Sequence, residues 1–317
     1  MQKTKLQICR IIKLDMETTL KVENVTKRYG DFVAVNNISF EVKAGRIFGF
    51  LGPNGAGKTT TIRMIVNITA PDEGEISLFG DKISPQVQDK IGYLPEERGL
   101  YKKMKIAEQL RYFAALKGIS SKIADQRIDF WLDRIGLSEW KLKKANDLSK
   151  GMQQKIQFIS AVIHEPDLII LDEPFSGLDP VNVETLIEII TELKAKGKTI
   201  IFSTHLMETA ERLCDDIILI NKSRKVLGGT LREVKESFEK NMISLRCFGG
   251  DKILEDKRFV AEIRKHADEV ELTLAENADP QELLKELLSN GAKVTKFELV
   301  EPSLNDIFID KVKEKNA

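Results

Sequence analysis

The sequence predicts an α/β fold with buried parallel strands, an all-helical insert and a small C-terminal α+β domain. Three observations lead to this prediction. The aliphatic runs at 168–171 and 199–202 are typical of strands that are buried on both faces of a parallel sheet. From about residue 105 to 165 the apolar residues follow helical spacing. After residue 240, short alternating strands and amphipathic helices form a separate group.

The predicted strands of the first domain are short and either alternating or continuously apolar. They lie at 20–29, 33–42, 47–51, 75–79, 91–94, 168–171, 199–202, 216–220 and 225–227. We expect turns at 36–37, 44–45 and 228–229, where Asn and Gly interrupt the pattern. In the second domain, Ser303 and Asp306 predict the start of a final helix.

Composition and periodicity divide the chain into three segments. Residues 1–15 carry four basic residues and only a broken apolar stretch, so we expect a disordered extension, with Met16 as an alternative start. The first folded domain is predicted at 16–235, with its helical insert at about 97–165. The second is predicted at 240–317, and none of its residues is typical of a catalytic site.

The overall composition argues against several classes of protein. Lys and Arg (49) balance Asp and Glu (49), whereas nucleic-acid-binding proteins usually carry a basic excess, so we expect no nucleic-acid partner. No apolar run approaches the roughly 18 residues of a membrane-spanning helix. The three cysteines form no C-x-x-C pair, which fits a reducing compartment.

A phosphate-binding loop is predicted between the strand at 47–51 and the following helix. Residues 52–59 match the G-x-x-x-x-G-K-[ST] pattern, in which glycines let backbone N–H groups point at phosphate oxygens. Lys58 would reach the β- and γ-phosphates, and the Thr59 hydroxyl would bind Mg²⁺. The candidate phosphate-binding residues are Gly52, Pro53, Asn54, Gly55, Ala56, Gly57, Lys58, Thr59 and Thr60.

Two consecutive carboxylates, Asp172 and Glu173, end the aliphatic run at 168–171. Alone, this pattern is a weak signal, because apolar runs that end in Asp-Glu are common and are more often solvated strand ends. Together with a phosphate loop it predicts that Asp172 faces Mg²⁺ and that Glu173 lies beside the γ-phosphate. Glu173 could then accept a proton from the attacking water, an effect worth about 10²–10⁴-fold in rate.

The order of motifs around these residues resembles that of the ATP-binding subunit of an ABC transporter. The set comprises the phosphate loop, a glutamine-type loop at 95–97, a signature at 148–152, the Asp-Glu pair, a D-loop at 176–179 and a switch histidine, His205. The resemblance covers about residues 20–229 and implies a P-loop ABC nucleotide-binding domain, with a mixed sheet core, an antiparallel β subdomain and an all-helical insert. The same resemblance implies a Mg-dependent ATPase that binds ATP and Mg²⁺. It also implies a head-to-tail dimer, homodimeric or heterodimeric, with each ATP between one subunit's phosphate loop and the other's signature.

The resemblance further implies roles for individual residues. His205 is expected to contact the γ-phosphate, which makes it a catalytic candidate beside Lys58 and Glu173. Tyr29 stands where the family stacks an aromatic ring on adenine, although a tyrosine that packs on its strand is the alternative. The remaining implied nucleotide-binding residues are Ser149, Gly151 and Asp179, and the implied metal ligands are Thr59, Asp172 and Glu96.

The signature segment suits a contact with phosphate, because Ser149 is a good helix N-cap and Gly151 permits close backbone approach. It departs from the usual Leu-Ser-Gly-Gly-Gln at Lys150 and Met152. Glu96 replaces the usual glutamine; a carboxylate can bind Mg²⁺, but when ionised it cannot donate a hydrogen bond. These departures, with the α+β tail, resemble the ABC-2-type exporter branch, which includes sodium- and drug-extrusion systems.

The expected function is therefore that of an ATP-hydrolysing subunit at the cytoplasmic face of the cell membrane, which powers export through a separate ABC-2-type permease. The alternative is a soluble ABC ATPase that acts on ribosomes or DNA. Such proteins typically carry two cassettes, long coiled coils or zinc modules, and this chain has one cassette without them. The tail could support a dimer, dock the permease or only add stability.

Overall fold

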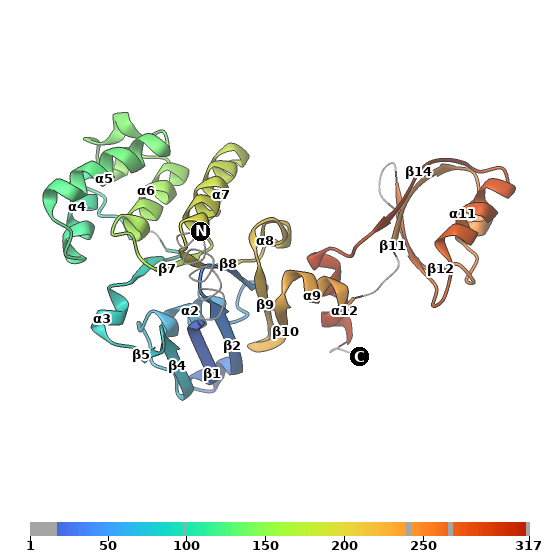
Figure 1. The fold of residues 1–317 in the computed structure, drawn as a ribbon, viewed down its shortest axis with the longest axis horizontal. Coiled ribbons are helices and arrows are strands. Elements are labelled where there is room, and N and C mark those ends of the chain that lie inside the picture. Colours follow the sequence, from blue (N-terminus) through green and yellow to red (C-terminus); the bar gives the residue numbers. More distant parts are fainter. Residues whose placement is uncertain (1–17, 98, 239–241, 266–268, 315–317) are drawn as a thin grey trace, which may run out of the picture. The chain divides into compact units, whose positions relative to one another are not determined.

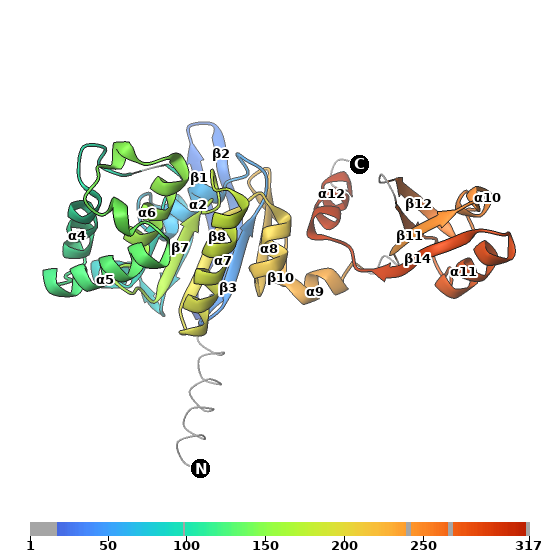
Figure 2. The same cartoon turned by 90° about the horizontal axis from the view of Figure 1, so that it is seen from above.

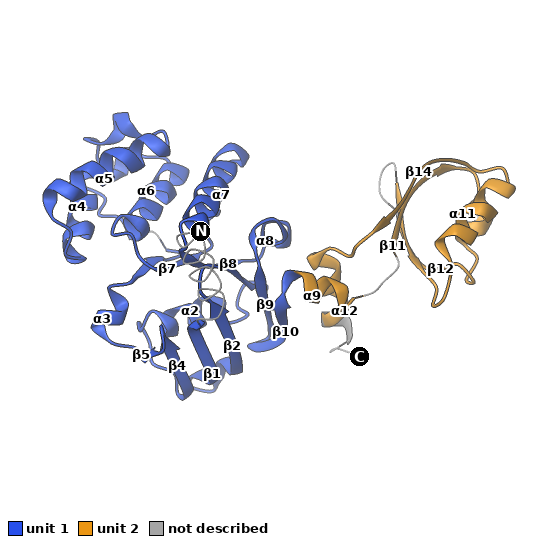
Figure 3. Ribbon diagram, viewed as in Figure 1, with its two compact units in different colours: residues 1–231 blue, residues 232–317 orange. Residues whose placement is uncertain are grey.

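The computed structural model describes residues 18–97, 99–238, 242–265 and 269–314. The extension expected at 1–15 lies outside the described residues. The chain divides into two compact units between Leu231 and Arg232 (Figure 3). Each unit has a hydrophobic core of its own.

A mixed six-stranded sheet forms the centre of the first unit, in the order β10-β9-β3-β8-β7-β6 (Figure 1). All neighbouring strands from β9 to β6 are parallel, and β10 pairs antiparallel with β9 at the edge. The strands are β3 (Ile47–Leu51), β6 (Ile91–Leu94), β7 (Leu168–Asp172), β8 (Thr199–Thr204), β9 (Asp216–Asn221) and β10 (Arg224–Thr230). The carboxyl ends of the parallel strands therefore meet at one edge of the sheet.

A second, antiparallel sheet in this unit has the order β2-β1-β4-β5. Its strands are β1 (Thr18–Tyr29), β2 (Phe32–Lys43), β4 (Glu73–Leu78) and β5 (Asp81–Lys82). Helix α2 (Lys58–Ile65) shares one core cluster with β1, β2, β4 and the central strands. On the mixed sheet, α7 (Pro180–Ala195) contacts β8 and α8 (Met207–Leu213) contacts β3 (Figure 2).

Two predicted turns are wrong. Asn36 and Asn37 lie inside β2, which bulges there instead of ending; Asn37 has a φ of 50°, a conformation that asparagine tolerates. Gly228 and Gly229 lie inside β10. The chain reverses between β9 and β10 at Lys222 and Ser223, which both have positive φ.

The helical insert packs beside β6 and β7 (Figure 1). Its helices are α4 (Ile106–Leu116), α5 (Ser121–Arg134) and α6 (Lys150–Val162), with single 3₁₀ turns at Ser138–Trp140 and Ala145–Asp147. The described residues 99–105 form no helix, and α4 begins at Ile106, close to residue 105 where the helical spacing of apolar residues starts in the sequence. The short helix α3 (Pro85–Gln88) precedes β6.

The second unit is an antiparallel sheet in the order β12-β13-β11-β14, with helices between its strands. Its elements are α9 (Leu231–Glu236, which begins one residue before the division), β11 (Met242–Phe248), α10 (Asp251–Leu254), β12 (Val260–Lys265), β13 (Val270–Leu274), α11 (Pro280–Ser289), β14 (Lys293–Val300) and α12 (Leu304–Glu314). This is the split β-α-β arrangement of ferredoxin-like folds. As predicted, Ser303 and Asp306 open the last helix: the Asp306 N–H donates to Ser303 Oγ at 3.2 Å.

Within the described ranges, no helix combines the length and the apolar character that a membrane crossing requires.

Candidate active site

The phosphate loop follows β3, all five residues of which are buried. Gly52 has a φ of 149°, and a Cβ atom there would lie 2.1 Å from the Ile220 carbonyl oxygen. At Gly57, with a φ of 108°, a Cβ atom would lie 2.4 Å from the Ala34 carbonyl oxygen. Both ends of the loop therefore pass so close to neighbouring backbone that only glycine fits.

The middle of the loop is open to solvent. Asn54 and Gly55 are exposed, whereas Ala56 is buried below them. The Ala56 N–H donates to the Pro53 carbonyl at 3.2 Å, and the Ser223 N–H donates to the Ala56 carbonyl at 3.2 Å. The exposed tip is thus held from below by backbone hydrogen bonds.

Lys58 begins α2 directly after the loop, and its side chain is almost fully buried. The Lys58 ammonium donates to the carbonyl oxygens of Gly52 at 2.7 Å and Pro53 at 3.2 Å, and lies 3.5 Å from Glu173 Oε1. Thr60 is half-buried in the first turn of the helix. The loop, the ammonium and the positive end of α2 therefore face the same space, an arrangement suited to phosphate.

The two predicted carboxylates lie at the carboxyl end of β7, which β8 separates from β3 in the sheet. Asp172 is fully buried and pairs in register with Ser203 of β8. The Ser203 hydroxyl donates to Asp172 Oδ1 and accepts from the Glu173 N–H at 3.0 Å. Glu173 has a φ of 50°, a conformation that costs a non-glycine residue about 1–2 kcal/mol. One serine thus holds both acidic residues in place.

The oxygen groups beside Asp172 fit a Mg²⁺ ion. Asp172 Oδ2 is buried without a hydrogen-bond partner, and burial raises the pKa of this carboxyl although the Ser203 hydrogen bond opposes the shift. The Thr59 hydroxyl lies 3.4 Å from Glu96 Oε2. A hydroxyl and two carboxylates are the hard oxygen ligands that Mg²⁺ accepts beside water and phosphate. A cation would supply the partner that Asp172 Oδ2 lacks.

His205 follows the carboxyl end of β8, the strand between β3 and β7. Its Nδ1 lies 3.1 Å from Glu173 Oε1 and 3.2 Å from Glu173 Oε2, and its side chain is 49% exposed. Lys58 and His205 therefore both contact the Glu173 carboxylate. The three catalytic candidates lie together at the ends of three adjacent strands.

Tyr29 lies at the end of β1, where it pairs with Phe32 across the hairpin. Both rings are largely exposed, with fractions of 47% and 61%. The Lys27 ammonium lies 5.6 Å from the centre of the Tyr29 ring. An exposed ring can stack on a base, and its exposure is equally compatible with a tyrosine that packs on its own strand beside Lys27.

The signature and D-loop residues lie apart from this cluster. Ser149 caps α6, where its Oγ accepts from the Met152 N–H at 3.2 Å. A Cβ atom at Gly151 would lie 3.2 Å from the Gly177 carbonyl oxygen. Asp179 caps α7 by accepting from the Asn182 N–H at 3.0 Å, which lowers the Asp179 pKa. Among the described residues, no hydrogen bond or ion pair joins Ser149, Gly151 or Asp179 to the phosphate loop.

Polar residues that were not among the predicted site residues connect these motifs. Gln157 on α6 is buried, and its amide donates to the carbonyls of Glu97 at 3.0 Å and Pro95 at 3.5 Å. Gln154 donates to the Pro174 carbonyl at 3.2 Å, just after the Asp-Glu pair. A glutamine at an inward position of an apolar helix face was the available signal. For Ser203 the signal was its place two residues before His205.

Known proteins resemble this chain in both sequence and fold. The family profile described as "ABC transporter" matches residues 35–176, and the profile "ATP-binding protein DrrA1-3-like, C-terminal domain" matches residues 229–312. The Bacillus subtilis (strain 168) protein "Uncharacterized ABC transporter ATP-binding protein YhaQ" is 46% identical over 92% of this chain and 98% of its own length. "Nod factor export ATP-binding protein I" of Cupriavidus metallidurans is 40% identical over 70% of this chain and 74% of its own.

A solved structure described as "Structure of ATP binding subunit of ABC transporter" superposes with a TM-score of 0.66 at 35% identity. The superposition covers 70% of this protein's chain and 93% of the chain in the solved structure. The C-terminal match and the export relatives support the predicted ABC-2-type exporter branch. The chain belongs to the family of ABC transporter ATP-binding proteins, whose members bind ATP, are ATPases in general and work with membrane permease components.

Proposed function

We propose that this chain hydrolyses ATP in a Mg²⁺-dependent reaction and that this reaction powers export through a separate ABC-2-type permease. The observation that carries the proposal is the convergence of Lys58 and His205 on Glu173, with contacts of 3.5 and 3.1 Å. These residues come from three separate segments, and their meeting beside a phosphate loop is the arrangement that phosphoryl transfer needs.

In the proposed reaction, water attacks the γ-phosphorus of ATP. Glu173 Oε accepts a proton from this water as the new P–O bond forms, and the bond from the γ-phosphorus to the β-phosphate oxygen breaks to release ADP. His205 positions the Glu173 carboxylate and the γ-phosphate, and the Lys58 ammonium stabilises negative charge on the transferred group. Mg²⁺ held by Thr59, Asp172 and Glu96 would neutralise charge on the β- and γ-phosphate oxygens.

The second half of the site would come from another nucleotide-binding subunit, either a copy of this chain or a paralogue. Ser149 and Gly151 begin α6, a helix of 13 residues, and neither bonds to the described phosphate loop of its own chain. Facing the γ-phosphate of the opposite site, the positive end of α6 would act as about half an elementary charge. The Ser149 hydroxyl would stay engaged as the helix cap.

A groove beside the 95–97 loop is the proposed contact with the permease. It has a volume of about 280 Å³ and is lined by apolar residues that include Pro95, Phe113 and the 64%-exposed Leu116. Through the Gln157 hydrogen bonds, this loop is connected to the signature helix. Movement of α6 on ATP binding could thus reach a permease in the groove. Such a partner would hold the chain at the cytoplasmic face of the membrane.

Export as the direction of transport rests on likeness to named relatives. The printed name of the Cupriavidus metallidurans protein refers to Nod factor export, and the tail matches a DrrA1-3-like C-terminal domain. The cargo of this chain is handled by the permease and is not encoded in these residues.

Phosphate release by Glu173→Gln tests the proposal. The variant should still bind ATP with Mg²⁺, and its turnover should fall by about 10²–10⁴-fold because the amide cannot accept the proton. Glu139→Gln, at an exposed glutamate in the 3₁₀ turn Ser138–Trp140, is the matched control and should turn over normally. Normal turnover by Glu173→Gln would refute the proposed base.

Purification of the native complex in detergent, through a tag on this chain, tests the partner. A polytopic membrane protein should co-purify. Recovery of ribosomes or DNA in its place would overturn the transport role.

A further inference from the structure

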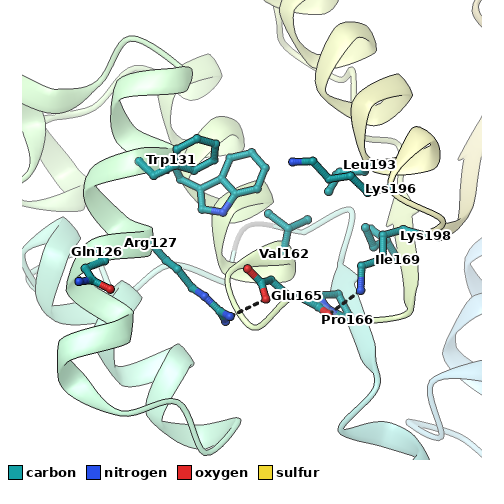
Figure 4. Close-up of a pocket in the computed structure, with 11 residues that line it drawn as sticks. Gln126, Arg127, Trp131, Val162, Glu165, Pro166, Ile169, Leu193, Lys196 and Lys198 are labelled. Atoms are coloured by element: carbon teal, nitrogen blue, oxygen red, sulfur yellow. Dashed lines mark hydrogen bonds and ion pairs between the residues drawn. The ribbon is translucent and has the colours of Figure 1, made fainter. Parts of the chain in front are cut away.

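A pocket of about 420 Å³ lies in the first unit between α5 of the helical insert, α6 and the end of α7 (Figure 4). It shares no lining residue with the proposed ATP site or with the groove beside the 95–97 loop. Its volume lies in the range of about 300–1,000 Å³ that is typical of small-molecule sites.

The walls of this pocket are apolar and come from four elements. Trp131 of α5, Val162 of α6, Ile169 of β7 and Leu193 of α7 are all buried and line it. They present an aromatic face opposite aliphatic side chains (Figure 4). Such walls favour a ligand with a flat or aliphatic apolar body.

The polar groups of the pocket are mostly hydrogen-bond donors. In Figure 4 the indole nitrogen of Trp131 and the Lys196 ammonium both point into the pocket. Among the described residues, the Trp131 N–H has no acceptor and Lys196 has no ion pair. Glu165, the one lining carboxylate, is already paired with Arg127. Lys198 donates to the Glu165 carbonyl and contacts Asp167, so it is satisfied too.

The excess of hydrogen-bond donors over acceptors in the pocket favours an anionic ligand. Two donors face the pocket without acceptors, whereas its side-chain acceptors are the amide oxygen of the exposed Gln126 and the Glu165 carboxylate that Arg127 already contacts. A cationic ligand would meet a pocket that carries three basic residues, Arg127, Lys196 and Lys198, against one paired carboxylate. A carboxylate between Lys196 and Trp131 would gain a charge-assisted hydrogen bond from each.

We propose that this pocket binds a small amphipathic monocarboxylate. Its apolar body lies against Trp131, Val162 and Leu193, and its carboxylate accepts from the Lys196 ammonium and the Trp131 indole N–H. Helices α5 and α7 already share an ion pair between Arg134 and Glu192. The bound ligand adds a further connection between α5 and α7.

Calorimetric titration of the full chain with three matched probes tests this proposal. The probes are naphthylacetate, its neutral isostere naphthylacetamide and the cation naphthylethylamine. Naphthylacetate should bind with a Kd of about 1 mM or tighter, and at least about tenfold tighter than either of the other two. ATP should not displace it, since the two sites share no residue.

Three variants locate the site. Lys196→Gln removes the charge, and Trp131→Phe removes the N–H while keeping an aromatic wall; each should weaken naphthylacetate binding by about fivefold or more. Lys122→Gln, at an exposed lysine of the same helix α5 outside the pocket, should leave binding unchanged. Equal binding of acid and amide, preference for the amine, no binding by any probe, or unaffected binding by Lys196→Gln would each overturn the proposal.

Discussion

The hydroxyl of Ser203 connects the two acidic residues of the site. It donates to Asp172 Oδ1 and accepts from the backbone N–H of Glu173, which itself has a left-handed φ of 50°. Ser203 is fully buried, so water cannot replace its hydroxyl without a rearrangement. It contacts no phosphate in the proposed reaction and acts as a positioning residue for the metal ligand and the base.

Ser203→Ala should therefore slow hydrolysis more than it weakens ATP binding. Without the hydroxyl, both Asp172 oxygens lack a partner, which should lower the free energy of unfolding by about 1–3 kcal/mol. Because the variant no longer holds the Glu173 backbone N–H in place, the base is less well positioned, and kcat should fall by on the order of 10–10²-fold. Phosphate release, ATP binding and thermal unfolding measure these three effects.

Ser160→Ala is the control for this prediction, because the Ser160 hydroxyl donates only to the Gln157 carbonyl within its own helix. That variant should keep its kcat. Loss of ATP affinity with unchanged kcat in Ser203→Ala would contradict the positioning role.

At the scale of the element, the turn from β3 into α2 depends on glycine for different reasons at different positions. Gly52 and Gly55 both have positive φ, at 149° and 76°. A Cβ atom at Gly52 would lie 2.1 Å from the Ile220 carbonyl oxygen, whereas no heavy atom lies within 4 Å of one at Gly55. Alanine substitutions at these two glycines therefore distinguish the energetic cost of a positive φ from the cost of steric overlap.

Without nucleotide, Gly55→Ala should cost about 1–2 kcal/mol of unfolding free energy, the price of a left-handed alanine. Gly52→Ala should cost about 1–3 kcal/mol more, because β9 must shift to admit the methyl group. Denaturant unfolding of both variants measures the difference. Equal losses would mean that the contact with Ile220 does not constrain the loop.

The segment from β3 through the phosphate loop to α2, and the Asp-Glu pair, could be predicted from sequence because each signal is local. A buried strand, a Gly-rich loop and a helix are contiguous in the chain, and so are Asp172 and Glu173. The role of Ser203 could not be predicted, since it depends on β7 lying beside β8 and joins residues 31 positions apart. Strand β12 gives little signal in the sequence, because Val260–Lys265 lacks regular alternation and lies at a sheet edge.

In the whole molecule, the two units have separate hydrophobic cores. We therefore expect the stabilities of the two units to respond differently to acid. In the second unit, hydrogen bonds from Lys296 at 3.0 Å and Ser244 at 2.8 Å, with Arg246 at 2.7 Å, lower the pKa of Glu269 to about 2. A carboxylate whose folded pKa lies below its ordinary value of 4.5 stabilises the fold above that value. The contribution is lost as the pH falls from about 4.5 towards 2.

At pH 7, the backbone amides of β11 and β14 should therefore exchange faster in Glu269→Gln than in the unmodified chain. This difference in exchange rate should shrink as the pH falls towards 2. Comparing both proteins at the same pH removes the intrinsic pH dependence of exchange. Glu298→Gln is the control, because Glu298 also contacts Lys296, at 3.5 Å, but is 61% exposed. A difference that stays constant down to pH 2 would exclude this linkage.

In the proposed mechanism, two subunits together complete each ATP site. Ser149 is well suited to test it, because it caps α6 and has no described contact with the phosphate loop of its own chain. Asp and Asn cap helices as well as Ser does. Ser149→Asp therefore preserves the helix and adds a negative charge where the opposite γ-phosphate would lie, whereas Ser149→Asn adds none.

The most direct measurement is the rate of Mg-dependent ATP hydrolysis by Ser149→Asp in the detergent-purified complex, relative to Ser149→Asn. Ser149→Asp should hydrolyse ATP about 10²-fold or more slowly than Ser149→Asn, with the ATP affinity of the separate chain unchanged. Equal hydrolysis by the two variants would contradict the shared site.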